Sequence, residues 1–273
     1  MSGKASGYGQ PMLKATLEAL LPAVCIAAAS PPAFAQWDNA IGVAARQFTV
    51  TEYNARGRRI VREQGWLPGL EGRLAYKADR WILFGEGEHY ESGIDYHGQT
   101  QLGAPVESRT ETELTQLRAG AAYAFNDNVS ALAALEWERW KRDIRGVQAV
   151  RGLQERTTSQ RLLLGLDSHY WARYGQASAS AALVLARPEK LQVGFSGMLD
   201  DASLETRSAT GLRLGLGLRP AAWRKVELRA SADWLKVERS DDAPVTRNGV
   251  FAGKIAQPEH VKRAFTLGLR YWF

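Results

Sequence analysis

The feature of this sequence that most constrains its fold is an alternation of apolar and polar residues at every second position. Segment 212–218 has leucine at each even position, with Arg213 and two glycines between them. Segments 226–234 and 265–273 repeat the same period. A period of two predicts β-strands with two different faces, whereas an amphipathic helix needs spacings of three and four. From residue 36 onward we therefore predict an all-β fold.

The connections between the predicted strands alternate between short and long. Short connections are expected at 77–80, 126–128, 172–175 and 219–223, and long ones at 52–64, 97–107, 145–155, 187–202 and 239–260. This alternation is typical of an antiparallel up-and-down transmembrane barrel, with tight turns at one end and long loops at the other. The ten predicted strands cover roughly 37–51, 65–76, 81–96, 108–125, 129–144, 156–171, 176–186, 203–218, 224–238 and 261–273.

The strand count depends on residues 187–202. Leu191, Val193 and Phe195 keep the parity of the strand before them, so that strand can run on beyond the membrane. If the stretch forms a strand of its own, the count changes, and eight and twelve strands remain as alternatives. Hydropathy does not oppose a barrel: a mean of −0.30, with no apolar run of 18 residues after residue 36, excludes helical spans only.

The N-terminus is predicted to be an export signal. Lys4 and Lys14 precede an apolar stretch at 19–29, and Ala33 and Ala35 have the small side chains that signal peptidase requires. We expect cleavage after Ala35, which makes 1–35 the signal peptide and 36–273 the barrel. Translation starting at Met1 or at Met12 fits equally. The only cysteine of the chain lies in the signal, so disulfides and cysteine metal sites are excluded from the barrel.

Aromatic residues concentrate beside the short connections, as expected at a membrane interface. The final segment, 265–273, alternates strictly and ends in Tyr271, Trp272 and Phe273. This ending resembles the C-terminal strand of Gram-negative outer-membrane β-barrels. The resemblance implies location in the cell outer membrane, contact with its lipid and lipopolysaccharide, and recognition of Tyr271 and Phe273 by the barrel-assembly machinery. We expect a monomer, and export removes nucleic acid as a partner.

Charged residues predict which strand face points into the barrel, because charge facing lipid at mid-membrane is costly. The predicted inward set is nearly balanced in sign and should pair internally, filling a narrow lumen. A narrow channel is the alternative. The set comprises Glu71, Arg73, Glu86, Glu88, Arg118, Glu136, Glu138, Arg161, Asp167, Arg213, Glu227, Arg229, Asp233 and Arg270.

Candidate catalytic residues are few. A ten-stranded barrel resembles the omptin family of outer-membrane proteases, which implies an aspartate pair facing an Asp–His pair at the extracellular rim. Here the candidates are Asp95 with His97 and Asp200 with Asp201, but each pair lies in the loop where that family has the other. Lipid A-modifying enzymes use a histidine with a serine, and no serine aligns with His89. The sequence favours a non-enzymatic protein; a rim-active hydrolase is the alternative, with no cofactor and no metal site.

The strongest binding signal is basic charge in the predicted extracellular loops. Guanidinium groups bind phosphate in a bidentate way, and lipopolysaccharide presents phosphates at the cell surface. We therefore expect a barrel that acts through its loops in surface binding, adhesion or envelope structure. The predicted lipopolysaccharide-binding residues are Arg56, Arg58, Arg59, Arg62, Lys141, Arg142 and Arg145.

Overall fold

The computed structural model describes residues 36–99, 103–147 and 151–273. The predicted signal peptide lies outside these residues. The described chain is almost entirely β-structure, and its one helical element is a 3-10 turn, η2, at Ala221–Trp223. None of the described helical residues forms a helix long and apolar enough to cross a membrane.

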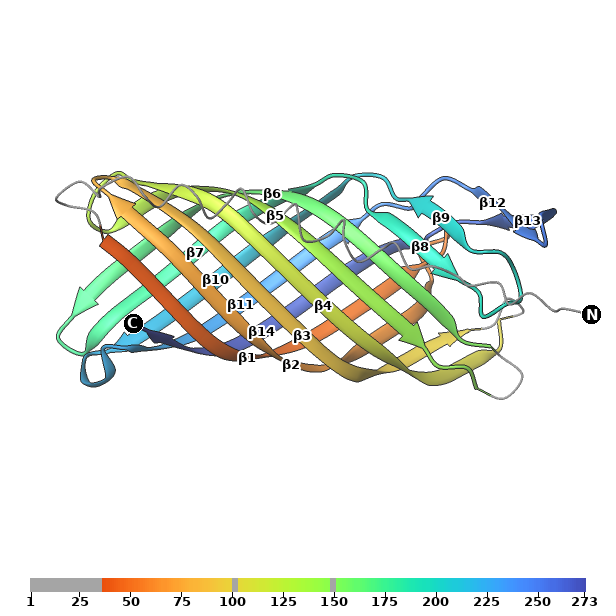
Figure 1. Cartoon of the computed structure of the whole chain (residues 1–273), viewed down its shortest axis with the longest axis horizontal. Helices are drawn as coiled ribbons and strands as arrows, with labels where there is room; N and C mark the ends of the chain where they lie inside the picture. The colour runs from red at the N-terminus through yellow and green to blue at the C-terminus, as the bar shows by residue number, and fades with distance from the viewer. Residues whose placement is uncertain (1–35, 100–102, 148–150) are drawn as a thin grey trace, which may run out of the picture. The chain divides into compact units, whose positions relative to one another are not determined.

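Ten strands close into an antiparallel barrel, which confirms the predicted fold class (Figure 1). Each strand pairs with its neighbours along the chain, β1 pairs with β14, and pairing of β5 with β6 completes the circle. The barrel strands are β1 (Gln36–Tyr53), β2 (Arg59–Ala78), β3 (Trp81–Gln99), β4 (Pro105–Ala124), β5 (Val129–Ile144), β6 (Leu153–Ala172), β7 (Gly175–Ala186), β10 (Ala209–Pro220), β11 (Val226–Val237) and β14 (Glu259–Trp272).

The uncertain stretch 187–202 extends the wall of the barrel. β8 (Lys190–Gly194) pairs with β6 just as β7 does, and β9 (Ala202–Glu205) pairs with β8. The predicted strand at 203–218 is therefore divided into β9 and β10. Residues 239–260, predicted as a loop, contain a separate hairpin of β12 (Ala243–Arg247) and β13 (Val250–Ile255).

The connection predicted at 52–64 is much shorter than expected. β1 runs to Tyr53 and β2 begins at Arg59, so only residues 54–58 connect them. Asn54 closes this turn, because its Oδ1 accepts hydrogen bonds from the backbone amides of Arg56 and Arg58, both at 3.0 Å. Paired β-strands thus project farther toward the loops than the alternation pattern indicated.

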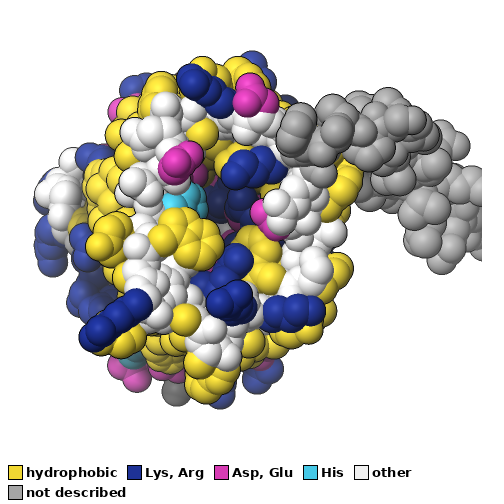
Figure 2. Space-filling view, turned by 90° about the vertical axis from the view of Figure 1, so that its left-hand side faces the viewer, with side chains coloured by type: hydrophobic (Ala, Val, Ile, Leu, Met, Phe, Trp, Pro, Cys, Tyr) yellow, Lys and Arg dark blue, Asp and Glu magenta, His cyan; other side chains and the backbone are white. Residues whose placement is uncertain are grey.

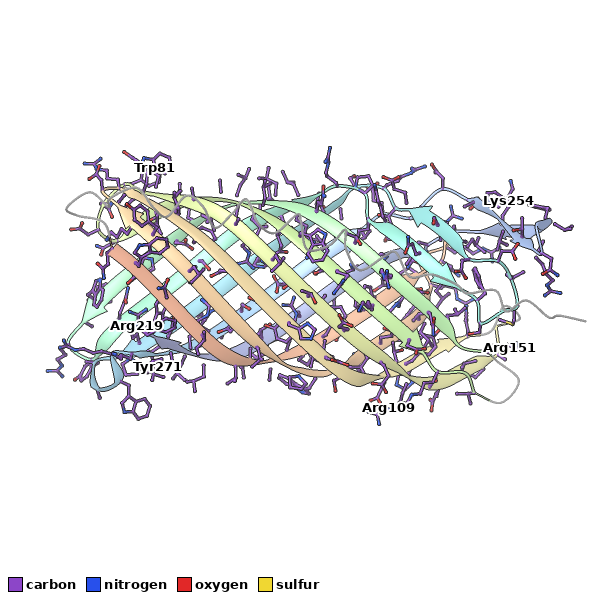
Figure 3. All side chains as sticks on the ribbon, in the orientation of Figure 1. Trp81, Arg109, Arg151, Arg219, Lys254 and Tyr271 are labelled. Carbon is purple, nitrogen blue, oxygen red and sulfur yellow. The ribbon has the colours of Figure 1, made fainter. Side chains whose placement is uncertain are left out.

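The two ends of the barrel differ. The turn end has the short connections and the C-terminus, and the loop end has β8, β9, β12 and β13 (Figure 1). Aromatic pairs stand at the turn end, with ring centroids 5.1 Å apart for Trp37 and Tyr76 and 5.0 Å apart for Trp81 and Tyr123. Figure 3 places Trp81 and Tyr271 at this end and Arg151 and Lys254 at the other.

The barrel wall is apolar outside and polar inside. Leu70 and Leu135 are 65% and 68% exposed on the outer face, while Glu136, which follows Leu135 on β5 and faces the lumen, is 2% exposed. A water-soluble protein buries apolar side chains and exposes polar ones. The opposite arrangement here is that of a barrel that spans lipid. Within the lumen toward the loop end, buried apolar side chains add a core that includes Phe48, Tyr90 and Trp140. A Cβ at Gly69 would lie 2.3 Å from the ring of Tyr90, so this glycine makes room for it.

Candidate functional site

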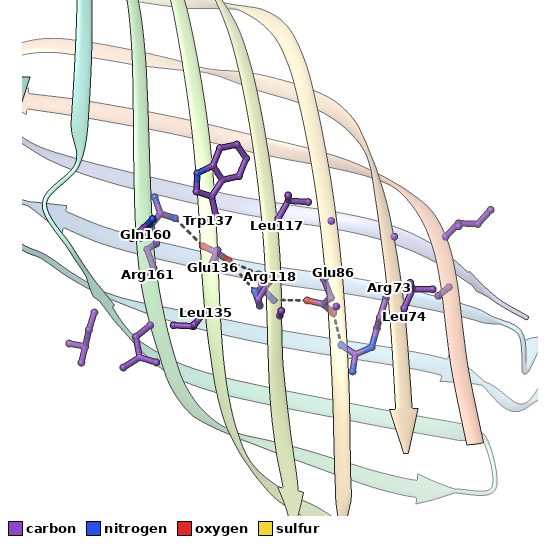
Figure 4. A pocket seen from close by; sticks show the side chains of 18 of the residues that line it. Arg73, Leu74, Glu86, Leu117, Arg118, Leu135, Glu136, Trp137, Gln160 and Arg161 are labelled. Atoms are coloured by element: carbon purple, nitrogen blue, oxygen red, sulfur yellow. Dashed lines mark hydrogen bonds and ion pairs between the residues drawn. The ribbon is translucent and has the colours of Figure 1, made fainter. Parts of the chain in front are cut away.

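Glu136 on β5 is the centre of the charges inside the barrel. Its carboxylate accepts hydrogen bonds from Arg213 at 2.6 Å, Arg118 at 3.0 Å and Arg161 at 3.2 Å. These guanidinium groups come from β10, β4 and β6, so one carboxylate on β5 is paired with both neighbouring strands and with β10, which is not adjacent to β5. Figure 4 shows Arg118 and Arg161 meeting Glu136.

The network continues from Arg118 toward the turn end. Arg118 Nη1 lies 2.7 Å from Glu86, which also receives Arg73 Nη1 at 2.5 Å. Glu71 is paired with Arg270 at 2.7 Å and with Arg229 at 2.6 Å. All of these residues belong to the predicted inward set, and their ion pairs confirm the inward face and the internal pairing.

Toward the loop end the network uses residues that the sequence did not single out. Glu189, which is fully buried between β7 and β8, lies 2.7 Å from Lys262 Nζ and 3.4 Å from His260 Nε2. Lys262 also contacts Glu138 at 3.4 Å. Arg46 lies 3.1 Å from Asp233. The parity of Arg46 and Lys262 with their strand neighbours indicates the inward face, but nothing in the sequence marks Glu189.

A second cluster lies nearer the loop end, beyond the outer aromatic residue Trp66. Arg142 lies 3.1 Å from Glu63 and 3.2 Å from Glu52, and it also pairs with Glu155. Burial raises the pKa of Glu63 to about 7, despite the opposing effect of Arg142. Glu63 Oε2 is buried without a hydrogen-bond partner. Three carboxylates thus share one guanidinium.

Arg142 is a correction to the predicted lipopolysaccharide-binding set. Its side chain is 4% exposed and points into the lumen, away from any lipid headgroup. Lys141 and Arg145 do face outward, but each is paired with a neighbouring carboxylate, Glu113 at 2.7 Å and Glu111 at 2.5 Å. The remaining members are exposed on the β1–β2 turn and the start of β2, at Arg56, Arg58, Arg59 and Arg62.

The structure does not assemble the candidate protease residues. Asp95 and His97 lie on the outer face of β3, and His97 Nδ1 is 3.6 Å from Glu107. Asp200 instead anchors the β12–β13 hairpin, accepting hydrogen bonds from Thr246 Oγ1 at 2.6 Å and from the Gly249 amide at 2.9 Å. These hydrogen bonds, that of Thr246 above all, lower the pKa of Asp200.

Asp201 is exposed beside this anchor. Across the described ranges, no hydrogen bond or ion pair joins Asp95 or His97 to Asp200 or Asp201. The described residues also hold no group of three or more histidine, cysteine, aspartate or glutamate side chains arranged to bind a metal ion.

The turn end of the lumen is hollowed, with cationic, acidic and histidine side chains in and around the opening (Figure 2). Asp167, a member of the predicted inward set, faces inward here together with His169, and His169 Nδ1 lies 3.4 Å from Gln176 Nε2. On the outside of the barrel there is an apolar recess lined by leucines such as Leu117 of β4 and Leu135 of β5 (Figure 4). Acyl chains fill such a recess in a membrane, so it is not a candidate ligand site.

Comparison with known proteins places the fold. No family model and no curated protein matches the sequence. Among solved structures, the outer-membrane protease OmpT from Escherichia coli matches with a TM-score of 0.57 at 10% identity, covering 87% of this chain and 96% of OmpT. The chain is a transmembrane β-barrel of the outer-membrane type. At this identity the likeness of the outer-membrane barrel to OmpT concerns the fold alone.

Two further outer-membrane barrels have lower scores. The translocator domain of the autotransporter NalP from Neisseria meningitidis has a TM-score of 0.48 at 14% identity, covering 87% of this chain and 89% of the domain. The attachment invasion locus protein Ail of Yersinia pestis has a TM-score of 0.35 at 13% identity, covering 87% of this chain and 99% of Ail.

Proposed function

We propose that this outer-membrane barrel is a non-conducting protein that acts through its loop end in surface binding, adhesion or envelope structure. The observation that supports a non-conducting barrel is the network of ion pairs that crosses the lumen. Glu136 alone is held by guanidinium groups from three strands, and each of those guanidinium groups has a further carboxylate partner, Glu86, Glu138 or Asp233. An ion crossing the barrel would have to separate these buried pairs, which is strongly unfavourable.

The apolar residues on the loop side of this network support the same conclusion. Phe48 and Trp140 meet edge to face across the lumen, with ring centroids 5.5 Å apart. The guanidinium of Arg142 lies 4.6 Å from the Trp140 ring centroid, which joins the loop-end cluster to this core. Side chains therefore fill the width of a ten-stranded barrel, whose interior is small.

Action through the loop end is supported by the ordered platform that β8, β9 and the β12–β13 hairpin form there. Leu191 and Val193 of β8 and Leu204 of β9 form a small buried core against Ala243 and Ile255 of the hairpin. The hydrogen bonds of Asp200 fix the far end of that hairpin. Its outer strand presents Val250 and Phe251, which are 70% and 63% exposed. Exposed apolar side chains on an ordered hairpin are suited to contact with a partner.

The arginines of the β1–β2 turn add a basic surface beside this platform. Asn54 fixes the backbone of the turn, so Arg56, Arg58 and Arg59 project from an ordered base into solvent. Lipopolysaccharide phosphates are the nearest anions that such side chains would meet in the outer membrane. A rim-active hydrolase has less support, because Asp200 is engaged in the hairpin and Asp95 faces outward.

Single-channel recording in planar bilayers tests the closed lumen. We expect no stable conductance from the wild-type protein, and stepwise openings in the variant Glu136→Ala, which removes the shared carboxylate. A stable ohmic conductance in the wild type that changes in the Glu136→Ala variant would overturn the proposal. Peptide and lipid A turnover should be absent from both the wild type and His97→Ala; turnover that depends on His97 would support the hydrolase instead.

A further inference from the structure

Outward-facing cations on two sides of the barrel differ in whether they are neutralised. On β4 and β5, Arg139 lies 3.5 Å and Lys141 2.7 Å from Glu113, and Arg145 lies 2.5 Å from Glu111. These pairs leave little net charge on that face.

In the described part of the chain, outward-facing cations without carboxylate partners occur where β14, β1 and β2 run side by side. Arg263 of β14 and Arg62 of β2 are both exposed on the outer face. Within the described residues, neither guanidinium has a carboxylate within ion-pair distance. Asp95, the nearest outward acid by register, is opposite Gln64 and makes no ion pair with Arg62. This face therefore keeps two uncompensated positive charges.

Polar side chains of β1 lie between the two arginines. Thr49 is the register partner of both Arg263 and Gln64, and Thr51 is the partner of Arg62. Because neighbouring strands are about 4.8 Å apart and residues rise about 3.4 Å along a strand, the two arginine Cα atoms are roughly 12 Å apart. Guanidinium groups on such long side chains can converge on one anionic group, with the threonine hydroxyls and the glutamine amide as further hydrogen-bond partners.

Aromatic side chains border the same patch on the membrane side. Phe265, the next outward residue after Arg263, is 43% exposed, and Trp234, the register partner of Arg263, is also 43% exposed. On β2, Trp66 is 52% exposed and is separated from Arg62 by Gln64 as the only outward residue between them. The patch thus joins cations and hydroxyls directly to aromatic and apolar surface.

We propose that the outer face of β14, β1 and β2 is a binding site for the phosphorylated headgroup of an outer-leaflet lipid, with Arg62 and Arg263 holding phosphate. The proposal deepens the proposed function and rests on its membrane placement. Guanidinium binds phosphate through paired hydrogen bonds. The lipid's acyl chains would lie along Phe265, Trp66 and the leucines of the same wall. A free phosphate would leave the aromatic part of the patch unused, which is why the site is assigned to a lipid.

The test uses protein extracted from outer membranes in detergent and measures binding of rough lipopolysaccharide with phosphorylated lipid A by native mass spectrometry. We expect R62Q/R263Q to bind at least tenfold more weakly than the wild type. The matched control K141Q/R145Q, which removes the same number of cations from the neutralised face, should change binding less than twofold. Heat-dependent migration on gels shows that each variant is folded.

Enzymatically dephosphorylated lipopolysaccharide and inorganic phosphate complete the test. Dephosphorylation should reduce wild-type binding as much as R62Q/R263Q does, and millimolar phosphate should not displace the lipid. The site is wrong if both double variants lose binding equally, if neither does, or if phosphate alone competes fully. These outcomes do not bear on the closed lumen, since the conductance measurement is independent of Arg62 and Arg263.

Discussion

Glu63 is the residue whose charge the loop-end cluster accommodates least well. It is fully buried, it shares Arg142 with Glu52 and Glu155, and its pKa is raised to about 7. Because the folded pKa is above the unfolded value, the folded state binds more protons than the unfolded state between these values. The contribution of Glu63 to stability is therefore greatest at acidic pH and falls as the pH rises from about 4.5 to 7.

The variant Glu63→Gln should remove this pH dependence. At pH 8 we expect a gain in unfolding free energy of up to about 3 kcal/mol, the equivalent of the pKa shift, and little change at pH 4. Denaturant unfolding in detergent at both pH values measures this. The comparison variant Glu113→Gln, on the outer face, breaks ion pairs with Lys141 and Arg139, so it should lower stability slightly at pH 8 rather than raise it. A Glu63→Gln protein with the wild-type pH profile would show that Arg142 compensates the charge fully.

Removing the charge of Glu136 should destabilise the barrel, unlike that of Glu63, because three guanidinium groups are paired with the Glu136 carboxylate. Replacing it with glutamine keeps the size but leaves Arg118, Arg161 and Arg213 with less compensating charge in a buried place. We expect a loss of about 3–5 kcal/mol in unfolding free energy. An exposed pair such as Arg145 with Glu111 should cost less than about 1 kcal/mol when Arg145→Gln breaks it. Equal losses in the two variants would contradict a central role for Glu136.

Strand parity identifies most lumen residues from sequence, and it also explains the error at Arg142. Arg142 has the same parity as Glu136 and Glu138, so alternation along β5 places it inside. The error came from assigning Arg142 to the binding surface because it lies close to the predicted loop at 145–155, although it belongs to the predicted strand 129–144 and its parity points inward. Glu189 has no comparable signal, since it lies in the segment 187–189 between two strands, where the register with β6 changes.

At the scale of elements, Asp200 links the two loop-end hairpins. The variant Asp200→Ala removes its hydrogen bonds with Thr246, Asn248 and Gly249, so the β12–β13 turn should lose its attachment to the β8–β9 hairpin. Trypsin should then cleave faster at Arg247 and Lys254, while the melting temperature of the barrel stays unchanged. In the control variant Asp201→Ala, one residue away, trypsin should cleave these sites at the wild-type rate. A lower barrel melting temperature for Asp200→Ala would mean that the hairpin supports the whole barrel.

The hairpin itself had a signal that the strand pattern concealed. Asn248 and Gly249 both have positive φ angles, 52° and 77°, as the two central residues of a type I′ turn require. An Asn-Gly pair between β-forming residues predicts such a hairpin, but alternation over 243–255 is too short to show two strands. The barrel strands were predictable because lipid on one side and ion pairs on the other impose a period of two over many residues. Beyond the membrane that constraint ends, and strand ends such as Tyr53 and Arg59 could not be placed.

For the whole molecule, the distribution of charge and aromatic residues defines an orientation. The turn end has short connections and aromatic pairs, whereas the loop end has extended strands and exposed arginines. Outer-membrane barrels have short turns in the periplasm and long connections outside the cell. Because the strand number is even, β1 begins and β14 ends at the same end of the barrel (Figure 1), and we expect this turn end to face the periplasm.

Trypsin added to intact cells tests this orientation. We expect cleavage at Arg56–Arg59 and at Lys254, which are exposed at the loop end, and none at Lys77 or Arg80, which flank the β2–β3 turn. Permeabilising the outer membrane should make the β2–β3 turn accessible, which controls for a site that is merely resistant. Cleavage at Lys77 or Arg80 on intact cells, with the loop end protected, would reverse the orientation. The Val250–Phe251 surface would then face the periplasm, and its partner would have to be sought inside the envelope.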